Sequence, residues 1–305
     1  MDILENYLQH FCGVDNVKRN EPLSRWTTFR VGGPARYFVL VKQKETLVRL
    51  IKALKYLDYP YFILGLGANV LASDQGFDGV VMKLEFQHIE QNDVFLYADA
   101  GAKLGAVVNF ARDHSLAGLA WAAGIPATIG GGVYMNCGAF GHSLSDVVVM
   151  VDVIMDGENK TLTRNQLDFS YRHSIFMDQS AVIIGAYLRL AHGDSSVISA
   201  EMQTIIEKRR QQPHEPSAGS VFKRPEGNYA GTLIESAGLK GTSIGGAQVS
   251  ELHAGFIVNK GGATAQDVLS LIKLIRERVF EMSGIMLEPE VRFVGRKKTI
   301  AMGVL

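Results

Sequence analysis

A glycine-rich segment, residues 124–141, constrains the fold of this chain more than any other feature. Six of its 18 residues are glycine, against 32 among all 305 residues. Such a segment adds few side chains to a core and loses much backbone entropy when it becomes ordered. A ligand that the bare backbone approaches closely would compensate, and a row of exposed amide N–H groups suits a phosphate or pyrophosphate. The alternative is a buried tight turn, and between the two we predict a phosphate-bearing cofactor.

The composition indicates an ordinary globular protein without a charge-driven partner. The 31 Lys and Arg residues balance the 31 Asp and Glu residues, so neither nucleic acid nor an anionic membrane surface is expected as a partner. Cys12 and Cys137 lie far apart and show no metal-binding spacing, which favours free thiols in a reducing compartment. We find neither the pattern of a signal peptide nor an apolar run of membrane-spanning length. A cytoplasmic protein without membrane insertion is expected.

Hydrophobic patterning predicts an α+β unit over residues 1–191. Apolar residues at helical spacing predict helices at 43–57 and 103–114. The expected strands lie at 36–41, 61–64, 79–84, 94–100, 147–155 and 181–190. Asp156-Gly157 after the fifth strand is typical of a hairpin turn. Glycine-rich loops after residues 64 and 123 are the candidate ligand sites of this unit.

The first of these loops is not a dinucleotide fingerprint. Gly65-Leu66-Gly67 follows a strand, but Val70 stands where the G-x-G-x-x-G pattern needs its third glycine. The residues that follow do not open a helix either. A Rossmann fold is therefore not predicted.

A smaller α+β domain is expected over residues 192–305. A helix at about 197–211 ends before Pro213, and Thr264 with Asp267 forms a capping box for a second helix that Gly284 ends. The inward face of the second helix comprises Val268, Leu271, Ile272, Ile275 and Val279. The last strand is expected at 285–293, with Leu287, Val291 and Phe293 on one face and Glu288, Glu290 and Arg292 on the other.

Three positions have side chains that could act in catalysis. Ser220 follows a glycine and precedes two cations, which suits a hydroxyl that meets an anionic ligand, although a turn serine has the same pattern. Arg172 is a surface cation or an anion-binding group, and Glu290 belongs to a solvated or a cleft-lining face. The eight histidines show no i, i+4 pair and no Cys partner, so no metal site is expected.

Taken in order, seven short motifs resemble those of the UDP-N-acetylenolpyruvoylglucosamine reductase family. The resemblance runs from about Thr27 to Gly295, and the short stretch between Arg224 and Gly245 is similar to the subtype that lacks an extra substrate-closing loop. The motifs are TFRVGGPA at 28–35, GLGAN at 65–69, GIP at 124–126 with the glycine triplet at 130–132, SYR at 170–172, GSVFK at 219–223, LKG at 239–241 and LEPEVR at 287–292.

The resemblance implies a fold, a reaction and a place in metabolism. The fold is an FAD-binding unit of the vanillyl-alcohol-oxidase type over residues 1–191, with two subdomains that meet near residue 70, followed by a substrate-binding domain over 192–305. NADPH, a co-substrate, reduces tightly bound FAD, and UDP-N-acetylglucosamine enolpyruvate then accepts a hydride from flavin N5 at its terminal carbon and a proton at the neighbouring carbon. The product, UDP-N-acetylmuramate, serves peptidoglycan synthesis. The resemblance also implies a monomer.

The resemblance implies roles for individual residues as well. Arg172 and Glu290 would stabilise the enolate, and Ser220 would donate the proton. Tyr171, Lys223, Lys240 and His253 would contact the UDP-sugar. The residues implied for FAD are Gly65, Gly67, Ala68, Asn69, Val70, Gly124, Pro126, Thr128, Gly130, Gly131, Gly132 and Asn136.

Some positions depart from the family pattern, and two other functions stay open. Arg224 stands where Asn is usual, and Ala127, Gly132 and Gly255 also differ from common family residues. One alternative is another flavin oxidoreductase of the same FAD fold. The other is a non-catalytic flavin- or nucleotide-binding paralogue, which would have no need to retain Arg172, Ser220 and Glu290.

Overall fold

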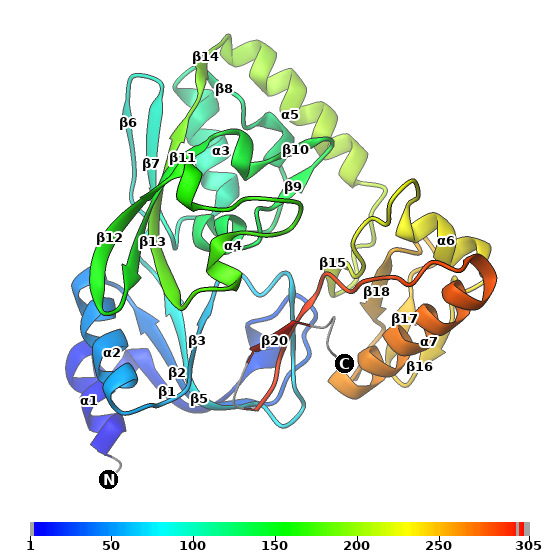
Figure 1. Ribbon diagram of the computed structural model, residues 1–305, viewed down its shortest axis with the longest axis horizontal. Helices are drawn as coiled ribbons and strands as arrows, with labels where there is room; N and C mark the ends of the chain where they lie inside the picture. Colours follow the sequence, from blue (N-terminus) through cyan, green and yellow to red (C-terminus); the bar gives the residue numbers. More distant parts are fainter. Residues whose placement is uncertain (1–2, 297–298, 302–305) are drawn as a thin grey trace. The chain divides into compact units, whose positions relative to one another are not determined.

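The computed structural model describes residues 3–296 and 299–301, and the chain forms two compact units (Figure 1). Unit 1 comprises Met1–Val17, Val39–Leu66 and Met82–Arg209, and unit 2 comprises Lys18–Phe38, Gly67–Val81 and Arg210–Leu305. The units thus divide the chain differently from the predicted boundaries near residue 70 and at 191/192. The predicted boundaries divide the chain by function, into FAD-binding subdomains and a substrate-binding domain, and they stay predictions.

Unit 1 is built on a five-stranded antiparallel sheet. The strand order is β12 (Glu158–Thr163), β11 (Val148–Met155), β13 (Ala181–Arg189), β7 (Phe95–Asp99) and β6 (Ile89–Asn92). Asp156 and Gly157 have φ angles of 55° and 79°, so the predicted hairpin turn between β11 and β12 is confirmed. The sequence did not predict β6, which is mostly exposed and polar.

The helices predicted at 43–57, 103–114 and about 197–211 all form within unit 1. Unit 1 contains α1 (Ile3–Cys12), α2 (Lys44–Tyr56), α3 (Leu104–Asp113), α4 (Ile129–Tyr134) and α5 (Ser195–Arg209), and α4 packs against β13 and β7. The apolar face of α2 is buried as predicted, except for Leu57, which follows the helix and is 54% exposed. Two short strand pairs complete the unit, β8 (Leu116–Ala117) with β14 (Ala191–His192) and β9 (Gly138–Ala139) with β10 (His142–Ser143).

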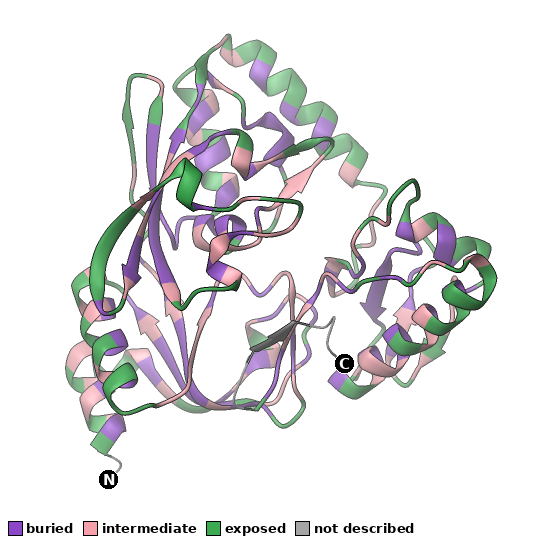
Figure 2. Ribbon diagram, in the orientation of Figure 1, coloured by how far each residue is buried: buried purple, intermediate pink, exposed green. Residues whose placement is uncertain are grey.

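Unit 2 contains a four-stranded antiparallel sheet and two helices. The strand order is β15 (Ser217–Ser220), β18 (Phe256–Asn259), β17 (Ala247–Val249) and β16 (Ser243–Ile244), and the helices are α6 (Ala230–Ser236) and α7 (Ala265–Ser283). A second sheet places β19 (Arg292–Val294) between β4 (Val70–Ala72) and β20 (Thr299–Ala301). One buried apolar cluster contains residues of β4, β15, β17, β18, α6 and α7, and buried stretches of α7 and β18 are purple in Figure 2.

Three of the five boundaries between the units fall within strands. These strands are β1 (Val17–Pro22), β2 (Pro34–Val41) and β5 (Phe77–Leu84), which belong to a sheet with the order β1, β2, β5 and β3 (Tyr61–Leu64). Within residues 3–296, no helix has the length and apolar character needed to cross a membrane.

The predicted capping box of α7 is confirmed. Thr264 Oγ1 accepts from Asp267 N–H at 3.0 Å, and Asp267 Oδ2 accepts from Thr264 N–H at 3.0 Å. Asp74 binds the two remaining N–H groups of the first turn, those of Ala265 and Gln266, at 2.7 and 3.0 Å. The first turn of the helix therefore has all of its orphan donors satisfied.

The predicted strand at 285–293 is wrong over most of its length, since only Arg292–Val294 forms a strand. Residues 288–290 instead run beside 221–223, where Lys223 N–H donates to Glu288 O and Glu290 N–H donates to Val221 O. Phe222 and Pro289 form an isolated bridge between these two hydrogen bonds, and Pro289 offers no N–H group to a strand on its other side. Leu287 and Val291 are buried as predicted, whereas Phe293 is only half-buried.

Removing the cap should weaken unit 2. Thr264→Ala deletes the acceptor for Asp267 N–H, and we expect the free energy of unfolding to fall by about 1 kcal/mol in a urea titration. Thr204→Ala is the matched control, because that hydroxyl is exposed inside α5 and binds only the Ala200 carbonyl oxygen. A control loss as large as that of Thr264→Ala would contradict the capping role.

Candidate active site

The glycine-rich segment folds into helix α4, and its amide groups face the protein. Ile129 and Gly130 N–H donate to the carbonyls of Ala102 and Ala100 at 2.8 and 2.9 Å. Gly131 and Gly132 N–H donate to the hydroxyl and the carbonyl of Thr128 at 3.2 and 2.8 Å. The prediction that this row of amide donors is exposed to a phosphate is therefore wrong for residues 129–132.

Two of the glycines are explained by close packing within unit 1. A Cβ atom at Gly130 would lie 3.0 Å from Cβ of Ala100, and one at Gly132 would lie 2.9 Å from Cδ1 of Leu144. Larger side chains would push α4 away from its neighbours. These two glycines therefore serve close packing inside a helix, which is not the tight turn that the alternative supposed. Gly131, in contrast, is exposed.

The two glycine-rich segments meet at Gly65 and Thr128. A Cβ atom at Gly65 would lie only 2.8 Å from Thr128 Oγ1, and Lys83 Nζ donates to the Gly65 carbonyl at 3.2 Å. Burial lowers the pKa of Lys83. The charge of Glu85 has the opposite effect and raises this pKa, whereas the charge of Lys103 lowers it. Lys83 therefore holds its ammonium group against backbone that lacks a side chain, where an anion could approach it.

Arg209, at the end of α5, is a candidate site residue that the sequence analysis missed. Its Nε donates to the Ala123 carbonyl at 2.9 Å, beside the start of the glycine-rich segment, and its guanidinium lies 5.3 Å from the Phe140 ring centre. Nη2 is buried and has no hydrogen-bond partner in the described part of the chain, and burial lowers the pKa of Arg209. In the sequence, Lys208 and Arg209 look like ordinary helix-ending cations. A buried donor without a partner fits an anionic cofactor.

The predicted cofactor residues 67–70 belong to unit 2. Gly67 has a φ of 66°, and a Cβ atom there would collide with the Trp26 carbonyl oxygen. Asn69 Nδ2 donates to the Glu290 carbonyl at 3.2 Å, and Asn69 O accepts from Arg292 N–H at 3.0 Å. Val70 pairs with Arg292 in the parallel β4–β19 ladder. This loop therefore fixes the backbone of the predicted catalytic Glu290.

Arg172 lies in a tight turn on the other unit. Ser170 and His173 exchange two backbone hydrogen bonds of 3.2 Å, and Arg172 between them has the left-handed φ of 55°. Its Nη2 donates to the Gly138 carbonyl at 2.8 Å, and its guanidinium lies 5.2 Å from the ring centre of the neighbouring Tyr171. Tyr171 itself is 54% exposed, so its ring is accessible to a ligand.

Ser220 and Glu290 are held on adjacent backbone in unit 2. Ser220 pairs with Phe256 after a bulge in β15, where Gly219 has a φ of 72°, and its side chain is exposed. Glu290 N–H donates to the carbonyl of Val221, the residue after Ser220, at 2.7 Å. Glu288, in contrast, binds Lys223 through an ion pair of 2.6 Å.

The predicted substrate-binding residues of unit 2 have protein partners that a ligand could replace. Lys240 Nζ lies 2.6 Å from Glu235 Oε1, and His253 Nδ1 accepts from Gly255 N–H at 3.1 Å. Arg224 lies 4.1 Å from the centre of the Tyr229 ring. Ion pairs this exposed contribute about 0–1 kcal/mol, so phosphate oxygens can compete with them.

One cluster has metal-ligand chemistry that the residue spacing did not predict. One ligand atom each from Asp168, His173 and Asp178 lies within 4.8 Å of the others. His173 Nε2 is already 2.9 Å from Asp178 Oδ2, and both aspartates are exposed. The expectation of no metal site had considered sequence spacing only.

Comparisons with known proteins agree with both parts of the predicted architecture. Residues 35–163 match the family described as FAD binding domain, and residues 211–294 match the family described as UDP-N-acetylenolpyruvoylglucosamine reductase, C-terminal domain. The two matches confirm the predicted α+β fold class, with an FAD-binding unit followed by a second domain.

Relatives extend the match over nearly the whole chain. The UDP-N-acetylenolpyruvoylglucosamine reductase of Caldanaerobacter subterraneus subsp. tengcongensis is 43% identical over 97% of this chain and 99% of its own length. The reductase of the same description from Agathobacter rectalis is 44% identical over 91% of this chain and 93% of its own length. The crystal structure of UDP-N-acetylenolpyruvylglucosamine reductase from Thermus caldophilus superposes with a TM-score of 0.80 at 34% identity, covering 91% of this chain and 98% of that one. The chain belongs to the UDP-N-acetylenolpyruvoylglucosamine reductase family.

Proposed function

We propose that this protein is an FAD-dependent reductase that uses NADPH to convert UDP-N-acetylglucosamine enolpyruvate into UDP-N-acetylmuramate for peptidoglycan synthesis. The observation that carries this proposal is the hydrogen bond between Arg172 and the Gly138 carbonyl. It holds a cation against the segment that follows α4, so the glycine-rich segment and a group able to stabilise an enolate belong to one local structure. Family membership supplies the substrate class.

The residues of unit 1 fit an anionic dinucleotide. Gly65 and Gly131 bring backbone without a side chain close to Thr128, Lys83 places a cation at Gly65, and Arg209 supplies a buried donor. FAD, when bound, supplies the hydride transfer that amino-acid side chains cannot perform. The other implied contacts, Gly67, Ala68, Asn69, Val70, Gly124, Pro126, Thr128, Gly130 and Gly132, are retained as proposed cofactor residues.

Arg172 would bind the carboxylate of the enolpyruvyl group. Reduction at the terminal carbon leaves negative charge on the neighbouring carbon and on this carboxylate, and a fixed cation stabilises that charge as it develops. Groups of this kind contribute about 10²–10³ in rate. Arg172 is suited to the task because its guanidinium is anchored by Gly138 and its turn by two backbone hydrogen bonds.

Ser220 would donate the proton that completes the reaction, and Glu290 would help to stabilise the enolate. A serine hydroxyl is a weak acid, so it suits only a strongly basic acceptor such as this carbanion. Glu290 is preferred over Glu288 because it directly precedes Val291 and Arg292 in the LEPEVR motif. Tyr171, Lys223, Lys240 and His253 are the proposed UDP-sugar contacts.

The two alternative functions have less support. A different flavin oxidoreductase would have no reason to match the reductase C-terminal domain over residues 211–294. A non-catalytic paralogue would have no reason to retain Arg172, Ser220 and Glu290 together. We propose a cytoplasmic monomer, in line with the expectation from the sequence.

The reaction itself can be followed by proton NMR. With NADPH and UDP-N-acetylglucosamine enolpyruvate, the vinyl proton signals should disappear while the methyl doublet of a lactyl ether grows, with stoichiometric oxidation of NADPH. NADPH oxidation that leaves the vinyl signals unchanged would contradict the proposal and favour the first alternative.

Ser220→Ala should affect only the second half of the reaction. Reduction of the flavin by NADPH should keep its wild-type rate, whereas reoxidation by the enolpyruvyl substrate should slow by about 10²-fold or more, the scale of a lost general acid. Rapid-mixing absorbance measures both rates separately. Equal losses in the two halves would rule out the role of Ser220 as proton donor.

The two glutamates provide a matched pair. Glu290→Gln should lower turnover by about 10²-fold, as expected for loss of a group that stabilises developing charge. Glu288→Gln removes a surface ion pair with Lys223 and should change turnover far less. Steady-state assays that compare the turnover of the two variants decide between the two carboxylates. The reverse ranking would show that Glu288 is the catalytic carboxylate.

A further inference from the structure

We propose that Asn136 is a positioning residue for Arg172, which its carboxamide holds through the turn at residues 170–173. The resemblance implied only a cofactor contact for this residue. The inference rests on the proposed function in one respect, namely that Arg172 acts on the enolpyruvyl substrate.

Three hydrogen bonds join Tyr134, at the end of α4, and two residues that follow it to the segment that carries Arg172. The Tyr134 carbonyl accepts from Ser174 Oγ at 2.7 Å, Asn136 Nδ2 donates to the Ser170 carbonyl at 2.8 Å, and the Gly138 carbonyl accepts from Arg172 Nη2 at 2.8 Å. Of the three contributions from residues 134–138, only that of Asn136 comes from a side chain. The hydrogen bond from Asn136 to Ser170 therefore depends on the identity of a side chain at 134–138, and a substitution of Asn136 can remove it.

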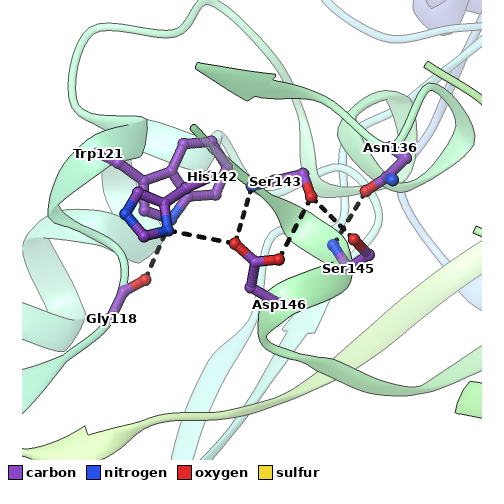
Figure 3. A network of polar contacts seen from close by, with 7 residues as sticks. All are labelled: Gly118, Trp121, Asn136, His142, Ser143, Ser145 and Asp146. Atoms are coloured by element: carbon purple, nitrogen blue, oxygen red, sulfur yellow. Dashed lines mark hydrogen bonds and ion pairs between the residues drawn. The ribbon is translucent and has the colours of Figure 1, made fainter. Parts of the chain in front are cut away.

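Asn136 is fixed at both ends of its carboxamide. Its Oδ1 accepts from the backbone N–H of Ser145 at 2.9 Å, as Figure 3 shows, while its Nδ2 binds Ser170. Ser145 lies in a short 3₁₀ helix that Ser143 and Asp146 close with a capping box. Asn136 is 4% exposed, so water cannot replace either partner.

The position requires asparagine for two reasons. The site needs one donor and one acceptor on a planar group, which an amide provides and a carboxylate does not. The backbone of Asn136 also has a φ of 42°, a left-handed conformation that asparagine tolerates better than most residues.

The turn needs such an external restraint because Arg172 is itself strained. Its φ of 55° is unfavourable for a residue with a long side chain, and such conformations persist only where the surroundings hold them. Without the bond from Asn136, Ser170 loses its link to the segment after α4, and the turn can relax. The guanidinium would then spend less time at the Gly138 carbonyl, where we propose that it meets the substrate.

The test compares Asn136→Asp with Asn259→Asp. Asn259 is the matched control because it too is a buried carboxamide bound to backbone groups, with Nδ2 donating to Phe29 O and Oδ1 accepting from Gly261 N–H. Both variants should lose stability. Only Asn136→Asp should slow reoxidation of the reduced flavin by the enolpyruvyl substrate, by about 10- to 100-fold, the scale of a small misplacement of a catalytic group.

Flavin content and the rate of reduction by NADPH should stay at the wild-type level in both variants. In an Arg172→Ala background, Asn136→Asp should slow reoxidation no further, because the two residues act through one group. Loss of FAD, equal slowing of both half-reactions, or an undiminished effect in the Arg172→Ala background would each overturn the positioning role.

Hydrogen exchange tests the same inference without substrate. Asn136→Asp should accelerate amide exchange in the peptide that covers residues 168–175, whereas Asn259→Asp should not. Unchanged exchange in that peptide would overturn the inference whatever the substrate proves to be. Wild-type enzyme that fails to reduce the enolpyruvyl substrate, while Asn136→Asp still loosens the turn, would instead refute the proposed function alone.

Discussion

The hydrogen bond between the Arg172 guanidinium and the Gly138 carbonyl is the contact on which the proposed chemistry depends. It has a length of 2.8 Å and is one of three links between residues 134–138 and the turn that carries Arg172. Since residues 134–138 begin with the last residue of α4, the glycine-rich segment and the arginine are parts of one local structure. A cation so anchored needs little reorganisation when negative charge develops beside it, and such preorganisation is the main source of electrostatic catalysis.

The glycine-rich segment achieves this arrangement in a way that differs from the usual phosphate-binding loop. The N–H groups of residues 129–132 bind acceptors of the protein itself, and Gly130 and Gly132 allow α4 to approach Ala100 and Leu144 closely. In the proposed function, the positive charge for an anionic cofactor comes instead from the side chains of Lys83 and Arg209. The glycines therefore contribute to the site chiefly through packing.

Sequence patterns predicted the elements whose signals are local. The capping box at Thr264, the apolar face of α7 and the Asp156-Gly157 turn were confirmed, because each depends on residues a few positions apart. Helix α4 was missed since three consecutive glycines oppose helix formation, and tertiary contacts stabilise it, among them those with residues 100–102, β13 and β7. The motif order identified the proposed catalytic residues, but not the link from Asn136 to Ser170, whose partners are 34 residues apart. Long-range hydrogen bonds of this kind leave no periodic trace in a sequence.

The most direct test of the account is an anaerobic titration of the fully reduced wild-type enzyme with UDP-N-acetylglucosamine enolpyruvate. The flavin absorbance should return in proportion to the substrate added, with one flavin oxidised for each molecule consumed and no other acceptor present. This result would establish that the protein delivers its electrons to the enolpyruvyl group. A flavin that stays reduced at excess substrate would contradict the central claim and require a different acceptor.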